Sequence, residues 1–128
     1  MKRSLKRILL VDDNPELLTS VKALLVTEGY EVHTVEHGKK ALATLESNEV
    51  DLVITDIIMP EHEGIETIAA LRKKDDQMPI IAMSGGGQIT AEEHLKLAMV
   101  MGAIDTLRKP FSADELLSSI QTAFKCVS

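Results

Sequence analysis

Residues 51–60 read DLVITDIIMP, and this stretch decides the fold class. Leu52, Val53 and Ile54, with Thr55, form a short run of mostly apolar, β-branched residues that ends at Asp56. An unbroken run of this kind is typical of a strand whose two faces are both covered by helices. We therefore expect residues 52–55 to form a central strand of a parallel sheet, with a carboxylate at its end.

The same alternation of short apolar runs and longer amphipathic stretches continues on both sides of this strand. Further strands are expected at residues 8–11, 30–35, 80–83 and 103–107. Helices are expected from Asn14-Pro15 to Gly29, from Gly38, from Gly64, from Thr90 to about Met101, and from Ser112. Thr90 with Glu93, and Ser112 with Glu115, have the spacing of a capping box. Five strand–helix units predict an α/β fold with helices on both faces of a parallel sheet.

Composition limits the class of protein. The chain has 128 residues and a formal net charge of -6, with 45% apolar and 27% charged residues, which predicts one globular domain over residues 1–128. Residues 1–6 are expected to be a solvated basic leader and residues 125–128 a short tail. The acidic balance argues against direct nucleic-acid binding, and no stretch is long enough to cross a membrane. Cys126 is the single cysteine, so a reducing cytoplasm is the expected compartment.

Unusual polar residues follow the expected strands. Asp12 and Asp13 follow the first, Asp56 the third, Ser84 the fourth and Lys109 the fifth. Ligands of such sheets bind beyond the carboxyl ends of the strands, so these side chains should converge. Grouped carboxylates repel one another unless a cation neutralises them, and an oxygen-only set without His or Cys favours Mg²⁺. Together with an ammonium and a hydroxyl, the group suits transfer of a phosphoryl group to a carboxylate.

The arrangement resembles the receiver domain of two-component response regulators, and in particular single-domain, chemotaxis-type regulators. The resemblance rests on ILLVDDNPE at residues 8–16, DLVITDIIMP at 51–60, IIAMS at 80–84 and GAIDTLRKPF at 102–111. It implies a flavodoxin-like, doubly wound (βα)5 fold with strand order 2-1-3-4-5. It also implies a signalling protein rather than an enzyme, although one that catalyses its own phosphoryl transfer and dephosphorylation.

The resemblance assigns a role to each site residue. Asp56 would accept a phosphoryl group from a histidine kinase or phosphotransfer protein in a Mg²⁺-dependent reaction. Asp13 would bind Mg²⁺ directly with Asp56 and the backbone carbonyl of Ile58, and Asp12 would bind it through water. Lys109 would pair with the phosphoryl oxygens, and Ser84 would be the switch hydroxyl.

The chain departs from the usual pattern of this family at one position that matters for signalling. Members of this family commonly carry an aromatic residue three positions before the lysine, where this chain has Thr106. We therefore expect the signal to run mainly through Ser84 and the glycines at 85–87. Few residues follow Phe111, so we expect output through a protein partner at the fourth helix, fifth strand and fifth helix. A phosphorylation-dependent dimer is compatible with the same expectation.

Two alternatives stand beside this interpretation. A haloacid dehalogenase-type phosphatase needs a second acid two positions after its nucleophile, but Ile58 follows Asp56 there, and Pro15 follows Asp13. A pseudo-receiver would keep the fold and bind partners without phosphorylation, and Thr106 gives that alternative some weight. Against it, every acidic, hydroxyl and lysine position of the site is filled by a competent residue.

Overall fold

The computed structural model describes residues 6–57, 63–75, 77–85, 96, 99 and 102–126. In chain order the elements are β1 (Arg7–Val11), α1 (Pro15–Thr27), β2 (Glu31–Val35), α2 (Gly38–Ser47), β3 (Leu52–Asp56), α3 (Glu63–Lys74), β4 (Ile80–Ser84), β5 (Asp105–Arg108) and α5 (Ala113–Cys126). All strand pairs are parallel, and the sheet has the order β2-β1-β3-β4-β5. The expected doubly wound topology is confirmed, and β3 is the central strand.

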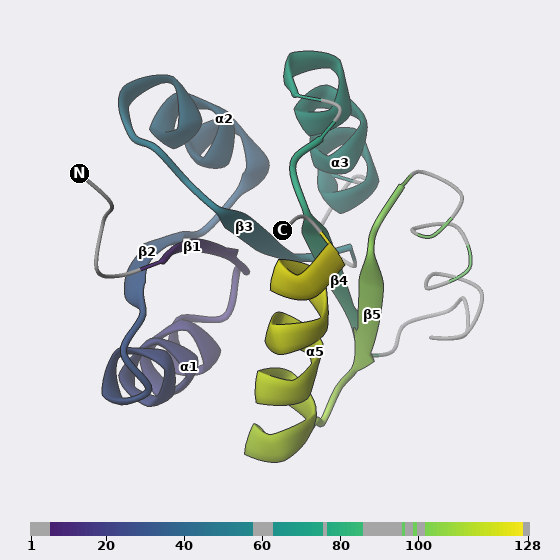
Figure 1. Ribbon diagram of the computed structural model, residues 1–128. Coiled ribbons are helices and arrows are strands. Elements are labelled where there is room, and N and C mark those ends of the chain that lie inside the picture. Colours follow the sequence, from purple (N-terminus) through teal and green to yellow (C-terminus); the bar gives the residue numbers. More distant parts are fainter. Residues whose placement is uncertain are drawn as a thin grey trace.

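Helices cover both faces of the sheet, with α1 and α5 on one side and α2 and α3 on the other (Figure 1). Successive strand residues point to opposite faces, so each strand supplies both halves of the core. In β3, for example, Ile54 packs with the cluster under α1 and α5, whereas Val53 packs with the cluster under α2 and α3. Burying one such aliphatic side chain contributes about 1.5–3 kcal/mol. This two-sided burial explains why residues 52–55 are a nearly continuous apolar run.

The boundaries of all five strands differ by one or two residues from the sequence-based expectation. β3 and β4 each extend one residue further than expected, to Asp56 and Ser84. β1 begins one residue earlier, at Arg7, and β2 one residue later, at Glu31. The expected strand at 103–107 is β5 at Asp105–Arg108, because Gly102, with a φ of 101°, lies in a turn and the chain bends again at Ile104. The ladder with β4 starts only where Asp105 lies opposite Ile81.

The structure describes only two residues of the expected fourth helix. Lys96 and Met99 are helical and exposed, whereas the expected capping box of Thr90 and Glu93 lies outside the described residues. The second capping box is confirmed. The Ser112 amide donates to Glu115 Oε1 at 3.1 Å, and the Glu115 amide donates to Ser112 Oγ at 3.0 Å. In the part of the chain that the structure describes, no helix is long and apolar enough to cross a membrane.

Asn14 caps α1, as its sequence position predicts. Its Oδ1 accepts hydrogen bonds from the amides of Glu16 at 2.9 Å and Leu17 at 3.4 Å, and Pro15 fills the first helical position. Asn14→Ala should lower the free energy of unfolding by about 1 kcal/mol, because two amide donors lose their acceptor. Urea denaturation measures this change, and Asn14→Ser keeps an acceptor oxygen as the matched control. Equal stability of the two variants would contradict the capping role.

Candidate phosphoacceptor site

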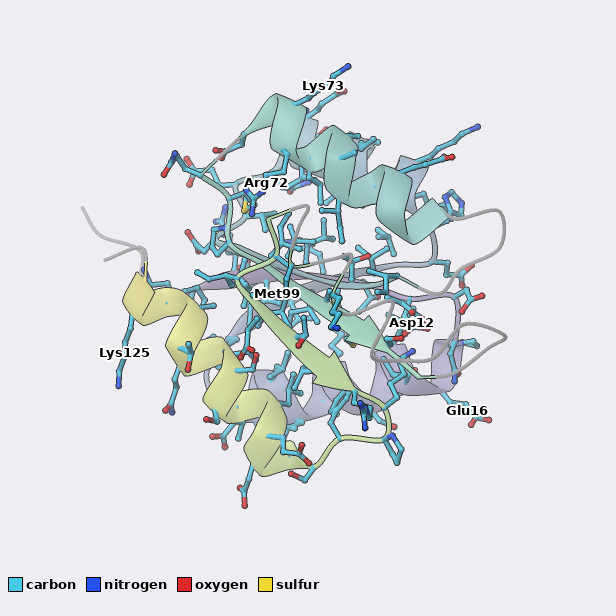
Figure 2. The ribbon with its side chains drawn as sticks, turned by 90° about the vertical axis from the view of Figure 1, so that its right-hand side faces the viewer. Asp12, Glu16, Arg72, Lys73, Met99 and Lys125 are labelled. Carbon is cyan, nitrogen blue, oxygen red and sulfur yellow. The ribbon has the colours of Figure 1, made fainter. Side chains whose placement is uncertain are left out.

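The carboxyl ends of the strands bring the expected polar residues to one edge of the sheet. Asp56 and Ser84 are the last residues of β3 and β4, Asp12 directly follows β1, and Lys109 directly follows β5. Asp12, Asp56 and Ser84 are buried, whereas Asp13 is exposed. Figure 2 shows Asp12 at this edge, near the start of the helix that carries Glu16. A parallel sheet therefore groups residues that lie far apart in the sequence.

Lys109 joins the two buried carboxylates. Its Nζ lies 2.6 Å from Asp12 Oδ2 and 2.9 Å from Asp56 Oδ2. The backbone holds it there, because the Lys109 amide donates to the carbonyl oxygen of Ser84 at 2.7 Å. The Lys109-Pro110 peptide is cis. The lysine thus provides a positive charge at the point where the carboxylates meet.

The pKa of Lys109 reflects its position between these acids. Burial by itself lowers the pKa of the ammonium, but hydrogen bonds and Coulomb attraction from Asp12 and Asp56 together outweigh burial. The net effect raises the pKa above its ordinary value of 10.5. Lys109 is therefore protonated at neutral pH and holds its charge more firmly than a solvated lysine.

The acidic group still carries more negative than positive charge. Carboxylate oxygens of Asp12, Asp13 and Asp56 all lie within 4.8 Å of one another, and Lys109 is the cation paired with two of them. Asp12 is oriented further by the Asn14 amide, which donates to its Oδ1 at 2.8 Å. Three oxygen ligands with a residual negative charge fit a hard divalent cation such as Mg²⁺. The residues present therefore fit the ion expected from the sequence.

Ser84 supplies a hydroxyl group at the same edge. Its side chain is completely buried, and within the described residues its Oγ makes no hydrogen bond. Buried hydroxyl groups normally have a hydrogen-bond partner, so the Ser84 hydroxyl is free to bond an acceptor brought close to it. This property suits the switch role that the sequence suggested, because a new acceptor near Asp56 would provide that partner.

Some of the expected site residues lie outside the described part of the chain. Ile58, whose carbonyl was expected to bind the cation, lies outside the described residues, as do two of the three loop glycines, Gly86 and Gly87. Thr106 lies half-buried in β5, and its amide donates to Asp105 Oδ1 at 2.9 Å.

Sequence reasoning missed a groove of about 480 Å³ beside the site. It is lined by Asn14, Glu16, Leu17, Ser20, Val21, Gly85, Lys109, Pro110 and Phe111. Its walls come from α1 and from the segment between β5 and α5, which are distant in sequence. No local pattern could indicate this juxtaposition, because it depends on how both segments pack on the same face of the sheet.

Curated relatives are similar over nearly the whole chain. The chain is 38% identical over 121 residues to the transcriptional regulatory protein CpxR of Klebsiella pneumoniae, covering 94% of the chain and 50% of that protein. It is 36% identical over 118 residues to the transcriptional regulatory protein GlrR of Escherichia coli, covering 92% of the chain and 26% of that protein. The chain thus spans half or less of these relatives, so they do not confirm the expected single-domain protein.

Solved structures of similar length share the fold. A CheY-like receiver domain protein from Methanospirillum hungatei has a TM-score of 0.83 and 34% identity, with 92% of each chain covered. A receiver domain protein from Clostridium thermocellum has a TM-score of 0.85 and 34% identity, covering 94% of this chain and 95% of that one. The model of the response regulator receiver domain matches residues 8–121. The chain therefore belongs to the receiver domain family of two-component response regulators.

Proposed function

We propose that this chain accepts a phosphoryl group on Asp56 from a histidine kinase or phosphotransfer protein, in a Mg²⁺-dependent reaction, and thereby switches a surface for a protein partner. The observation that carries the proposal is the placement of Asp56. Its carboxylate ends the central strand, is 4% exposed, and lies beside Lys109 and the carboxylates of Asp12 and Asp13. Burying a carboxylate is costly unless it is compensated, and buried acids grouped with other charged side chains are concentrated at functional sites.

The transfer itself needs a nucleophile and stabilisation of charge. An oxygen of Asp56 forms the new O–P bond, the P–N bond of the donor phosphohistidine breaks, and the imidazole leaves with that electron pair. Lys109, already 2.9 Å from Asp56, pairs with the phosphoryl oxygens. Asp13, Asp56 and the Ile58 carbonyl would hold the Mg²⁺ ion directly, and Asp12 through water. When bound, the ion supplies positive charge that offsets the charge of the phosphoryl group.

Signalling would follow from the hydroxyl of Ser84. An aspartyl phosphate gives this buried hydroxyl a strong acceptor, and Ser84 reaches it by moving toward Asp56. The partner surface proposed for the output comprises the fourth helix, β5 and α5. Met99, which is 51% exposed, lies on this side of the molecule (Figure 2). An exposed methionine adapts well to a protein contact. A phosphorylation-dependent dimer is compatible with the same proposal.

The rival interpretations have less support. A pseudo-receiver needs a defect in the site, but Asp12, Asp13, Asp56 and Lys109 are all present and lie together. The phosphatase alternative still lacks its second acid, because Ile58 occupies that position. We also propose a cytoplasmic location, supported by a composition with one cysteine.

Intact mass spectrometry tests the proposed function. The protein is incubated with a small acyl-phosphate or phosphoramidate donor, with Mg²⁺ in one sample and with a chelator in the other. We expect the mass of one phosphoryl group to be added only with Mg²⁺, because the three carboxylates otherwise repel the incoming anion. Absence of an adduct with donors of both classes would overturn the proposal and favour the pseudo-receiver.

A further inference from the structure

We propose that Arg72 is a positioning residue for the proposed partner surface, because its guanidinium anchors the end of the fourth helix to α3 through the carbonyl oxygen of Gly102. This contact joins residues 30 positions apart in the sequence. It is separate from the contacts of the phosphoacceptor site. Its consequence for signalling rests on the function proposed above.

The contact lies at the edge of the sheet opposite the phosphoacceptor site. Arg72 is in the last turn of α3, which leads to the start of β4, and Gly102 lies in the turn that leads to β5. The Ile104 amide donates to the Ile80 carbonyl oxygen at 2.7 Å, so this turn lies beside the first residue of β4. A substitution of Arg72 can therefore act on the partner surface without touching Asp56.

The guanidinium of Arg72 binds a carbonyl oxygen on each of two segments. Its Nη2 donates to the Gly102 oxygen at 2.7 Å, and its Nη1 donates to the Asp75 oxygen at 3.4 Å. Asp75 directly follows α3, and Gly102 follows the fourth helix, so both oxygens lie at C-terminal ends of helices. A cation is favoured there by the helix dipole and by the carbonyl groups that lack an intrahelical donor. The planar fork of one arginine thus holds two helix ends together.

The side chain of Arg72 also packs closely on Gly102. A Cβ atom built on Gly102 would lie 2.8 Å from Arg72 Nε and 3.5 Å from Cδ. The guanidinium therefore lies over the face of Gly102 on which any other amino acid would carry its side chain. Arg72 is half-buried on the side of α3 that faces the sheet, whereas its neighbour Lys73 is exposed and points away (Figure 2). The two adjacent cations of α3 thus differ in whether they can reach the turn.

The anchored turn carries part of the proposed partner surface. The Gly102 amide donates to the Met99 carbonyl oxygen at 3.0 Å, so the exposed Met99 lies within one helical turn of the anchor. On the other side of the anchor, β5 begins at Asp105. By holding Gly102, Arg72 fixes where Met99 and the start of β5 lie relative to α3.

The test compares backbone order in the wild type and in Arg72→Met, measured by NMR relaxation of the amides in the full, unphosphorylated chain. A rigid amide has an order parameter of about 0.85, and a flexible one has a value below about 0.6. The Gly102 amide should fall from about 0.85 to about 0.6 in the variant, because its turn loses a charged hydrogen bond. The Val53 amide, which donates to the Pro79 carbonyl oxygen at 3.1 Å in the central strand, should keep its value.

This measurement separates positioning from a general contribution to stability. A contact that only stabilises the fold changes the fraction of unfolded protein but not the order of the turn in the folded protein. An unchanged value for Gly102, or an equal fall at Val53, would therefore overturn the proposal.

Two further variants provide the controls. Lys73→Met removes the adjacent exposed cation by the same substitution and should leave the order of Gly102 unchanged. Arg72→Lys keeps the charge without the planar fork, so Gly102 should be less ordered than in the wild type and more ordered than in Arg72→Met. If Arg72→Met fails to fold, Arg72→Lys decides the question: lower order at Gly102 but not at Val53 supports the proposal, and an unchanged Gly102 overturns it.

Phosphorylation by a small acyl-phosphate donor distinguishes this proposal from the proposed function. Arg72→Met should be phosphorylated within about twofold of the wild-type rate, because the single group it removes lies at the opposite edge of the sheet from Asp56. A wild type that is phosphorylated beside a variant that is not would place the role of Arg72 in the site and overturn the proposal. If neither protein is phosphorylated, the proposed function fails, and the order of Gly102 still decides whether Arg72 is the anchor.

Discussion

Asp56→Asn is expected to abolish phosphoryl uptake while leaving the protein folded. The amide keeps the size of the carboxylate and an oxygen that can accept a hydrogen bond from Lys109 Nζ, now 2.9 Å from Asp56 Oδ2. It lacks the anionic oxygen that forms the acyl phosphate. The free energy of unfolding should stay within about 1 kcal/mol of wild type. Intact mass after incubation with donor and Mg²⁺ measures the loss, and urea denaturation verifies the fold.

The control for this variant is Asp114→Asn, which changes an exposed acid in the first turn of α5 by the same chemistry. It should be phosphorylated like the wild type. An adduct that persists in Asp56→Asn would place the acceptor elsewhere.

Asp13→Asn gives a third comparison, because it keeps the nucleophile and removes a proposed direct ligand of the cation. We expect that variant to need more Mg²⁺ for the same extent of phosphorylation.

Lys109→Met is expected to have the second largest effect, on both stability and activity. It keeps a long apolar side chain but leaves the buried carboxylates of Asp12 and Asp56 without their cation. The lysine side chain is 21% exposed, so water screens part of the pair. We therefore expect a loss of about 2–3 kcal/mol, below the cost of breaking a fully buried pair. Phosphorylation should slow about a hundredfold, as when one charge-stabilising donor is removed.

The stability difference between wild type and Lys109→Met should depend on pH in a defined direction. The pKa of Lys109 is raised in the folded protein above its ordinary value of 10.5, so folding favours the protonated form. The stabilisation is then complete below that value and disappears as pH rises through the higher folded pKa. Denaturation at about pH 7, 9 and 11 should show a constant difference at the first two and a smaller one at the third.

Lys125→Met serves as the matched control, because Lys125 is exposed on the last turn of α5 and points away from the site (Figure 2). It should leave phosphorylation unchanged, and as a surface substitution it should change the free energy of unfolding by only about 0.5 kcal/mol or less. Lys109→Arg keeps the charge but replaces the compact ammonium by a planar guanidinium. Full recovery of phosphorylation in Lys109→Arg would show that charge alone suffices at this position.

The sequence predicted the fold class because the local signals agree with the tertiary arrangement. Each apolar run became a strand, Asn14 capped α1, and Ser112 with Glu115 capped α5. The strand boundaries were less well predicted. Ala103 and Ile104 are apolar and were expected in the fifth strand, but the turn at Gly102 and the bend at Ile104 delay the strand to Asp105. Hydrophobicity carries no information about the φ angle of Gly102.

The candidate site was predicted as a set of residues but not as a geometry. That Asp12, Asp56, Ser84 and Lys109 converge follows from their positions at strand ends in one parallel sheet. Which of them touch does not follow. Lys109 binds both Asp12 and Asp56, whereas Ser84 Oγ has no partner within the described residues. These contacts depend on distances that are set by packing.

What the sequence by itself determined was the parallel sheet, its helices and the edge at which the polar residues gather, because periodicity and caps act over a few neighbouring residues. Only the tertiary structure decided the contact between Lys109 and Asp12, the groove between α1 and the segment after β5, and the burial of Asp12. These features depend on the separation of segments about a hundred residues apart, such as the 97 positions between Asp12 and Lys109. Such separations follow from how whole helices and strands pack, and no local pattern of residues records them.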